Sequence, residues 1–333
     1  MGNLISEQTR GVFVIAVTPF SPSGAIDYMS VDRMLDFYLG HGVHGLTILG
    51  IMGEAQKLTS EESLELTRHV LRQVGNKLPT VVGISGASFR VMKDLAQLSM
   101  DSGAAGVMVA PATGLRTDDQ IFNYYDSVCE AIGPDIPVVY QDYPQSTAVY
   151  LSPNLFLRLV KAYPQIVMLK HEDCPGLGKI SAIRRESERQ GIRRVSILVG
   201  NGALYYPLEL LRGADGAMTG FAYPEMLVQV FEQFTAGNVE RAEDLFDAYL
   251  PLVRYEQQPN VGLAIRKEIL HRRGAIASPV LRPPGYSLTQ ADKEELDRLM
   301  IRLERHLQRD ANLAQSYGAG TEQSHVARPA ASS

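Results

Sequence analysis

A lysine that ends an apolar run is the side chain with the clearest chemical potential in this chain. Lys170 closes the run QIVMLK, and Glu172 follows two positions later. Partial burial at the end of a strand disfavours an ammonium and favours the neutral amine, which attacks carbonyl carbons. In an extended segment residues i and i+2 point to the same side, so Glu172 is placed to move protons or orient a water beside that amine. The alternative for Lys170 is a side chain whose ammonium reaches solvent at a rim.

A glycine-containing turn is the second chemical signal, in LGIMGEAQKLTSEE at 49–62. Gly50 and Gly53 permit a tight turn whose exposed backbone N–H groups can hold a carboxylate. Such turns are common between a strand and a helix, so this one indicates a binding site only in combination with Lys170.

The elements that must position these residues repeat along the chain. Short apolar runs rich in Val and Ile are typical of strands buried on both faces, and helical patterns separate most of them. The runs lie at 11–20, 45–50, 80–85, 105–111, 137–142, 165–170, 194–201 and 215–221. Thr59 and Glu62 form a capping-box pattern before one helix. Eight such units favour a (β/α)8 TIM barrel of the α/β class over a doubly wound open sheet, and chemistry is then expected where the strands end.

The predicted domain organisation is one barrel followed by helices. The barrel occupies 11–224 after an N-terminal segment at 1–10, and residues 225–310 form C-terminal helices that complete the barrel and extend from it. Residues 311–333 have no periodic apolar face, which predicts a disordered tail. The C-terminal helical patterns lie at 225–256, 259–273 and 289–309.

Composition excludes several classes of function. The 333 residues carry a formal net charge of −5, which gives no electrostatic reason to bind nucleic acid or an anionic membrane. No apolar run is long enough for a signal peptide or a membrane span, which predicts a cytoplasmic protein. Two cysteines, Cys129 and Cys174, imply no disulfide framework. His41 and His44 fall in a turn at the opposite end of the barrel, so we expect no metal site.

Taken together, these patterns resemble the dihydrodipicolinate synthase/N-acetylneuraminate lyase family of class I Schiff-base lyases, over roughly residues 10–300. The resemblance implies a (β/α)8 barrel with extra C-terminal helices, a homotetramer and an imine between Lys170 and a 2-oxo acid, without a cofactor. The segments that carry it are VTPF at 17–20, GIMGE at 50–54 followed by LTSEE, VVG at 81–83, VMVAP at 107–111, Pro144, Lys170 and GADGAMTG at 213–220.

The departures from the family pattern are informative. Two loop threonines that help bind the substrate carboxylate in the family are replaced by Ile51 and Met52, so only backbone N–H groups are expected to bind it there. The Tyr-Tyr pair of the synthases is replaced by Ala112 and Thr113, and their carboxylate-binding arginine by Ser146. Loss of that charge-assisted contact argues against the synthase reaction.

The stretch VVYQDYP at 138–144 decides which side chain faces the reaction. The family places its catalytic tyrosine three residues before the proline, and that position is Gln141 here, not Tyr140. Strand side chains alternate, so Tyr140 is expected to pack outward against helices. A local bulge would return Tyr140 to the site as the alternative catalytic residue.

Gln141-Asp142 together with Lys170-x-Glu172 resembles the L-2-keto-3-deoxyarabonate dehydratase branch of the family. The resemblance implies a dehydratase of a 2-keto-3-deoxy sugar acid that yields 2-oxoglutarate semialdehyde. A pyruvate-releasing retro-aldolase, a dihydrodipicolinate synthase-type condensation and a 4-hydroxy-pyrroline-2-carboxylate deaminase are alternatives. A 2-oxo acid binding protein with a degenerate barrel is the non-enzymatic one.

The predicted site therefore has two parts. Lys170, Glu172 and Gln141 are the expected catalytic residues. The expected substrate-binding residues are Gly50, Ile51, Met52, Gly53, Glu54, Asp142, Ser146, Asn201, Met218 and Thr219.

Overall fold

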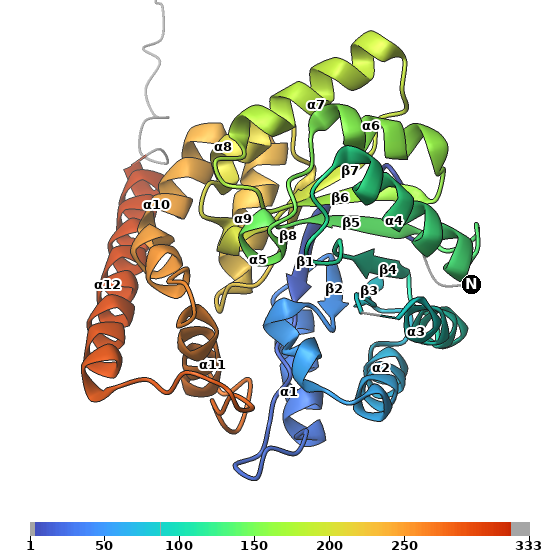
Figure 1. The fold of residues 1–333 in the computed structure, drawn as a ribbon. Coiled ribbons are helices and arrows are strands. Elements are labelled where there is room, and N and C mark those ends of the chain that lie inside the picture. Colours follow the sequence, from blue (N-terminus) through green and yellow to red (C-terminus); the bar gives the residue numbers. More distant parts are fainter. Residues whose placement is uncertain (1–3, 87, 321–333) are drawn as a thin grey trace, which may run out of the picture.

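The computed structural model describes residues 4–86 and 88–320, with side chains up to residue 309. Its centre is a closed barrel of parallel strands in sequential order, β1 to β8, with β8 paired to β1 (Figure 1). The barrel prediction is confirmed, and closure excludes the open sheet. The strands are β1 Gly11–Ile15, β2 Gly45–Ile48, β3 Thr80–Gly83, β4 Gly106–Val109, β5 Val138–Asp142, β6 Ile166–His171, β7 Ser196–Val199 and β8 Gly216–Thr219.

Helices follow the strands and surround the barrel (Figure 1). The capping box at the start of α2 forms as expected, because Thr59 Oγ1 accepts from Glu62 N at 3.1 Å and Glu62 Oε2 accepts from Thr59 N at 2.9 Å. The outer helices are α1 Tyr28–Gly40, α2 Ser60–Val74, α3 Phe89–Asp101, α4 Asp118–Ile132, α6 Pro153–Ala162, α7 Leu177–Gln190, α8 Tyr206–Leu211 and α9 Pro224–Thr235. Short helices follow three of the strands: η1 Ile51–Gly53 with η2 Ala55–Lys57, α5 Pro144–Thr147 and η3 Asn201–Ala203.

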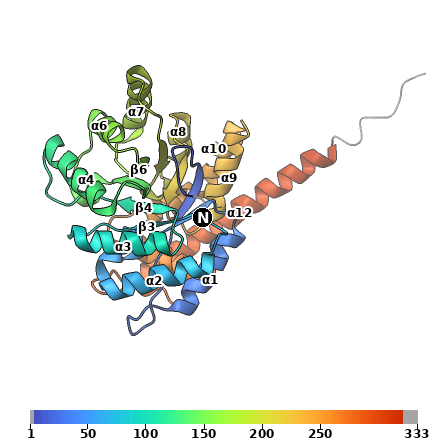
Figure 2. The same ribbon diagram turned by 90° about the vertical axis from the view of Figure 1, so that its right-hand side faces the viewer.

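Three further helices form the C-terminal extension, α10 Val239–Glu256, α11 Gly262–Arg272 and α12 Gln290–Gly320. The predicted helical block at 225–256 is in fact α9 and α10, which are separate helices. Helix α12 projects away from the barrel (Figure 2) and continues to Gly320, where Ala, Leu and Gln favour helix. The helix thus includes the first ten residues of the predicted tail, and residues 321–333 lie outside the described part.

The strands divide the apolar side chains between two layers. One cluster fills the barrel interior and includes Phe13, Met108, Val139 and Met218. A larger cluster lies between the strands and the surrounding helices. The alternation of side chains along each strand produces both layers, and it leaves the ends of the strands to form a pocket above the inner cluster. No helix in the described residues is long and apolar enough to cross a membrane.

Candidate active site

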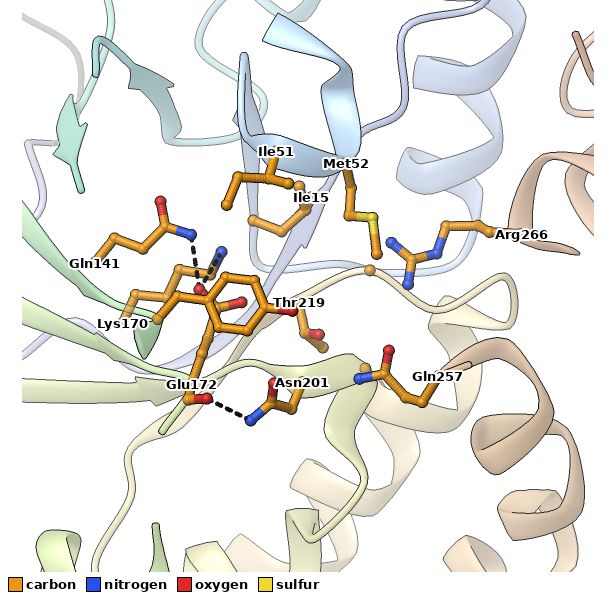
Figure 3. Close-up of a pocket in the computed structure, with 13 residues that line it drawn as sticks. Ile15, Ile51, Met52, Gln141, Lys170, Glu172, Asn201, Thr219, Gln257 and Arg266 are labelled. Carbon is orange, nitrogen blue, oxygen red and sulfur yellow. Dashed lines mark hydrogen bonds and ion pairs between the residues drawn. The ribbon is translucent and has the colours of Figure 1, made fainter. Parts of the chain in front are cut away.

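Lys170, Gln141 and Glu172 meet where β5 and β6 end. Gln141 lies opposite Lys170 in the β5–β6 register, so both side chains point into the barrel mouth (Figure 3). Lys170 is only 3% exposed, and its Nζ lies 3.0 Å from Glu172 Oε2. The same Oε2 accepts a hydrogen bond from Gln141 Nε2 at 2.7 Å. The three expected catalytic side chains thus form one contact group around a single carboxylate oxygen.

The loop after β7 fixes the position of Glu172. Asn201 Nδ2 donates to the Glu172 carbonyl oxygen at 2.7 Å. A Cβ atom at Gly200 would lie 2.2 Å from Glu172 Cγ, so only glycine leaves room for the carboxylate in this position. Asn201 therefore lies in the site, where it supports the backbone of the catalytic segment.

These side chains open into a cavity at the carboxyl ends of the strands (Figure 3). It is lined by Ile15, Ile51, Met52, Gln141, Tyr143, Lys170, Glu172, Asn201, Gly202, Thr219, Gly220, Gln257 and Arg266. A second, outer cavity shares Met52, Tyr143 and Gln257 with it and is also lined by Ser146 and Cys174. Ser146 is thus placed along the approach to Lys170.

The 50–54 turn presents backbone donors to the cavity. Within the turn, Gly53 N donates to Gly50 O at 2.9 Å and Glu54 N donates to Ile51 O at 3.0 Å. The first N–H groups of a 3₁₀-helix have no partner inside it, which leaves those of Ile51 and Met52 for a ligand. Gly50 and Gly53 shape this turn, but they are not among the residues that line the cavity.

Glu54 lies at the end of the turn and lines the outer cavity, but its carboxylate is paired with two lysines. It adopts a left-handed backbone conformation with φ +55° at the end of η1, and its side chain is 1% exposed. Its carboxylate accepts from Lys267 Nζ at 2.6 Å and from Lys57 Nζ at 2.8 Å. These contacts tie the turn to helix α11, and a role of Glu54 in substrate binding stays a prediction.

Two further residues predicted to bind substrate, Asp142 and Met218, line neither the inner nor the outer cavity. Asp142 faces the helix layer, where its Oδ2 accepts from Lys179 Nζ at 2.8 Å. Met218 is fully buried in the inner cluster, whereas its neighbour Thr219 lines the cavity.

The stretch 138–144 presents two side chains to the cavity, Gln141 and Tyr143. Tyr140 instead packs outward, with its ring stacked on Tyr125 at 4.3 Å between centroids and edge-on to Phe156 at 6.1 Å. Tyr140 therefore faces the helix layer and not the cavity, which argues against the alternative in which it is catalytic. Burial and the nearby Glu172 carboxylate raise the pKa of Tyr143, so its phenol stays protonated at neutral pH.

The sequence reasoning missed Tyr143, Gln257 and Arg266. Tyr143 lies two positions after Gln141, so in an extended segment both side chains point to the same face, and this spacing was sufficient to find Tyr143. Gln257 and Arg266 come from the end of α10 and from α11, which follow the barrel, and no local pattern marks them as pocket residues. Gly202, at φ +58°, makes room for Gln257, because a Cβ there would lie 2.6 Å from Gln257 Cδ.

The described residues contain no group of three or more His, Cys, Asp or Glu side chains placed to hold a metal ion. The polar side-chain groups of the cavity are an amine, a carboxylate, amides, a phenol, a hydroxyl and a guanidinium. Such a set suits imine formation and proton transfer on a carbonyl compound.

Comparison with known proteins shows the family to which this chain belongs. The sequence matches the model of the Dihydrodipicolinate synthetase family over residues 8–303. The chain belongs to this family. As its curated relatives are enzymes, a dehydratase and synthases, this family member is an enzyme of the lyase type that acts on small molecules.

The similar proteins carry different activities. L-2-keto-3-deoxyarabonate dehydratase of Azospirillum brasilense is 30% identical over 305 residues, which cover 89% of this chain and 94% of the relative. A 4-hydroxy-tetrahydrodipicolinate synthase of Thiobacillus denitrificans is 28% identical, covering 84% and 90%. The crystal structure of a dihydrodipicolinate synthase from Rhodopseudomonas palustris has a TM-score of 0.88 and 46% identity, covering 90% of this chain and 99% of that one. The reaction must therefore be argued from the site.

Proposed function

We propose that this family member is a dehydratase of a 2-keto-3-deoxy sugar acid, similar to L-2-keto-3-deoxyarabonate dehydratase. The observation that carries the proposal is the contact group in which the Glu172 carboxylate lies 3.0 Å from Lys170 Nζ and receives the Gln141 amide at 2.7 Å. It places a proton acceptor beside a nucleophilic amine, with a neutral amide where a catalytic tyrosine is expected in the family.

The reaction begins with attack of the Lys170 amine on the C2 carbonyl carbon. Loss of the carbonyl oxygen as water gives an iminium ion, which withdraws electrons from C3. Removal of a C3 proton then forms an enamine. The enamine expels the C4 hydroxyl group, which leaves as water after protonation, and tautomerisation followed by hydrolysis of the imine releases the semialdehyde and restores Lys170.

Glu172 is assigned the proton transfers at C3 and C4, directly or through a water, because its carboxylate is the acid–base group in contact with Lys170. Gln141 neither gains nor loses a proton at neutral pH, so its amide orients the carboxylate. Backbone N–H groups of Ile51 and Met52 are assigned to the substrate carboxylate. Asn201 supports Glu172 through its carbonyl oxygen, and Thr219 lines the cavity wall.

Borohydride trapping tests the imine. Incubation with pyruvate and borohydride is expected to add the mass of a reduced pyruvyl group to the peptide that contains Lys170. An unmodified Lys170 would refute the mechanism. A panel of 2-keto-3-deoxy acids then identifies the reaction, because a semialdehyde dehydrogenase detects the dehydratase product and lactate dehydrogenase detects pyruvate.

The second candidate is a pyruvate-releasing retro-aldolase, and Tyr143 favours it. The Tyr143 phenol lines the cavity with Lys170, and carbon–carbon cleavage needs an acid–base group for the hydroxyl of the departing fragment. Pyruvate formation in the panel would select this reaction. We also propose that the chain forms a homotetramer, which light scattering after size-exclusion chromatography tests. A cytoplasmic location stays a prediction.

A further inference from the structure

Arg266 lines the cavity, and its guanidinium has a buried donor without a partner among the described residues. Arg266 lies on α11 and is 1% exposed, and its Nη1 has no hydrogen-bond partner among the residues that the structure describes. Its Nε donates to Glu256 Oε1 at 2.5 Å, and Glu256 Oε2 accepts from Ala222 N at 3.2 Å. Glu256 therefore fixes one edge of the guanidinium and leaves Nη1 for another acceptor. A buried charged donor is costly to leave unpaired.

The strand end beside Arg266 is shaped to admit this group. A Cβ at Gly220 would lie 2.1 Å from Arg266 Nη1 and 2.7 Å from its Cζ, so any larger residue would displace the guanidinium. Gly220 and Arg266 both line the cavity that contains Lys170. The glycine thus lets a side chain from the C-terminal extension reach the barrel mouth.

We infer that Arg266 binds the carboxylate of the 2-oxo acid, together with the backbone N–H groups of Ile51 and Met52. This inference rests on the proposed imine chemistry at Lys170. Lys170 and Arg266 are the two basic side chains among the described residues that line the cavity. Since Lys170 is consumed in the bond to C2, Arg266 is the cation that remains for the C1 carboxylate.

The arrangement of the cavity supports the same partner. Met52 and Arg266 lie on one side of the cavity and Gln141 on the other, with Lys170 nearer Gln141 (Figure 3). The turn at Ile51 and Met52 offers no side-chain donor, so a carboxylate there needs one from elsewhere. An arginine N–H supplies a charge-assisted hydrogen bond to a carboxylate oxygen.

Paired trapping experiments test the inference with two probes of the same imine. Pyruvate carries the carboxylate, whereas acetaldehyde forms an imine at Lys170 without one. We expect Arg266→Lys to raise the pyruvate concentration for half-maximal borohydride trapping by about 10- to 100-fold, because one charge-assisted bond is lost. The acetaldehyde concentration for trapping at the same peptide should stay within about twofold of the wild type.

A double variant controls for misfolding caused by an unpaired buried charge. Arg266→Gln combined with Glu256→Gln removes both buried charges and should show the same selective loss for pyruvate. Arg272→Gln, on the same helix but outside the cavity, is the matched control and should bind pyruvate normally. Unchanged pyruvate trapping in the Arg266 variants would overturn the inference, as would an equal loss for both probes. Unchanged pyruvate trapping is also the result expected if Arg266 contacts a distal hydroxyl group of the substrate, because pyruvate has no such group.

A failure of the carboxylate assignment can be distinguished from a failure of the proposed imine mechanism. If the wild type traps neither probe at Lys170, the imine mechanism fails. The carboxylate assignment is then decided by calorimetric titration of pyruvate into Lys170→Gln and into Lys170→Gln with Arg266→Lys. Equal affinities would refute it, and a loss of about 10-fold or more in the second would support it.

Discussion

Replacing Gly200 with alanine should strongly reduce activity, although none of the residues assigned to catalysis is replaced. The new Cβ would lie 2.2 Å from Glu172 Cγ and 2.6 Å from its Oε1, whereas carbon atoms in contact are about 3.5 Å apart or more. The carboxylate must therefore retreat by roughly 1.3 Å. We expect such a shift to disturb the 3.0 Å contact between Lys170 Nζ and Glu172 Oε2, and with it the geometry that proton transfer needs.

The expected loss is that of one general acid–base group, about 10²- to 10⁴-fold or roughly 3–5 kcal/mol of transition-state stabilisation. Exchange of the pyruvate methyl protons with D₂O, followed by NMR, measures C3 deprotonation without a second substrate. Gly200→Ala should still be trapped by borohydride at Lys170 but should exchange slowly, as should Glu172→Gln. Gly178→Ala is the matched control, because a Cβ there meets nothing within 4 Å. Wild-type exchange by Gly200→Ala would refute the reasoning.

Other side chains give separate expectations. Lys267→Met leaves Glu54 buried without its 2.6 Å partner, and denaturant unfolding should show a loss of about 3–5 kcal/mol; a loss below about 1 kcal/mol would contradict it. Burial raises the pKa of Glu209 from 4.5 to about 8. Glu209 ionises at lower pH in the unfolded chain than in the folded one, so its contribution to the free energy of unfolding is full below pH 4.5 and is lost as the pH rises towards 8. Thermal scans should show a loss of up to about 5 kcal/mol relative to Glu209→Gln. Parallel pH profiles of stability for the two proteins would argue against a buried neutral acid. Tyr140→Phe should keep wild-type turnover and Tyr143→Phe should lose about tenfold or more; the reverse order would restore Tyr140 to the site.

Strand periodicity made the barrel and the centre of the site predictable. Lys170 and Glu172 are found because a buried strand seldom ends in a lysine followed by a carboxylate at the same parity. Counting from Pro144 selects Gln141 and rejects Tyr140, as the β5–β6 register shows. The same parity also selects Tyr143, so that residue was within reach of sequence reasoning.

The misplaced residues depend on contacts distant in sequence. Glu54 belongs to a turn that resembles a ligand-binding turn, and the sequence does not show that its carboxylate pairs with Lys267 of α11. Arg266 precedes Lys267 in a stretch that resembles an ordinary charged helix face. Which charged residues of such a helix are buried depends on how the helix docks, and local sequence does not contain that information.

Helix α11 holds the substrate turn and the cavity wall with two consecutive residues. Lys267 binds Glu54 at the end of the 50–54 turn, and Arg266 reaches Gly220 at the end of β8. A rotation or slide of this helix would therefore shift the 50–54 turn and the Arg266 guanidinium together, and it would change the distance from both to Lys170 Nζ on β6. If the proposed chemistry holds, substitutions in the packing of α10, α11 and α12 change the choice of substrate, while the barrel strands and Lys170 stay unchanged.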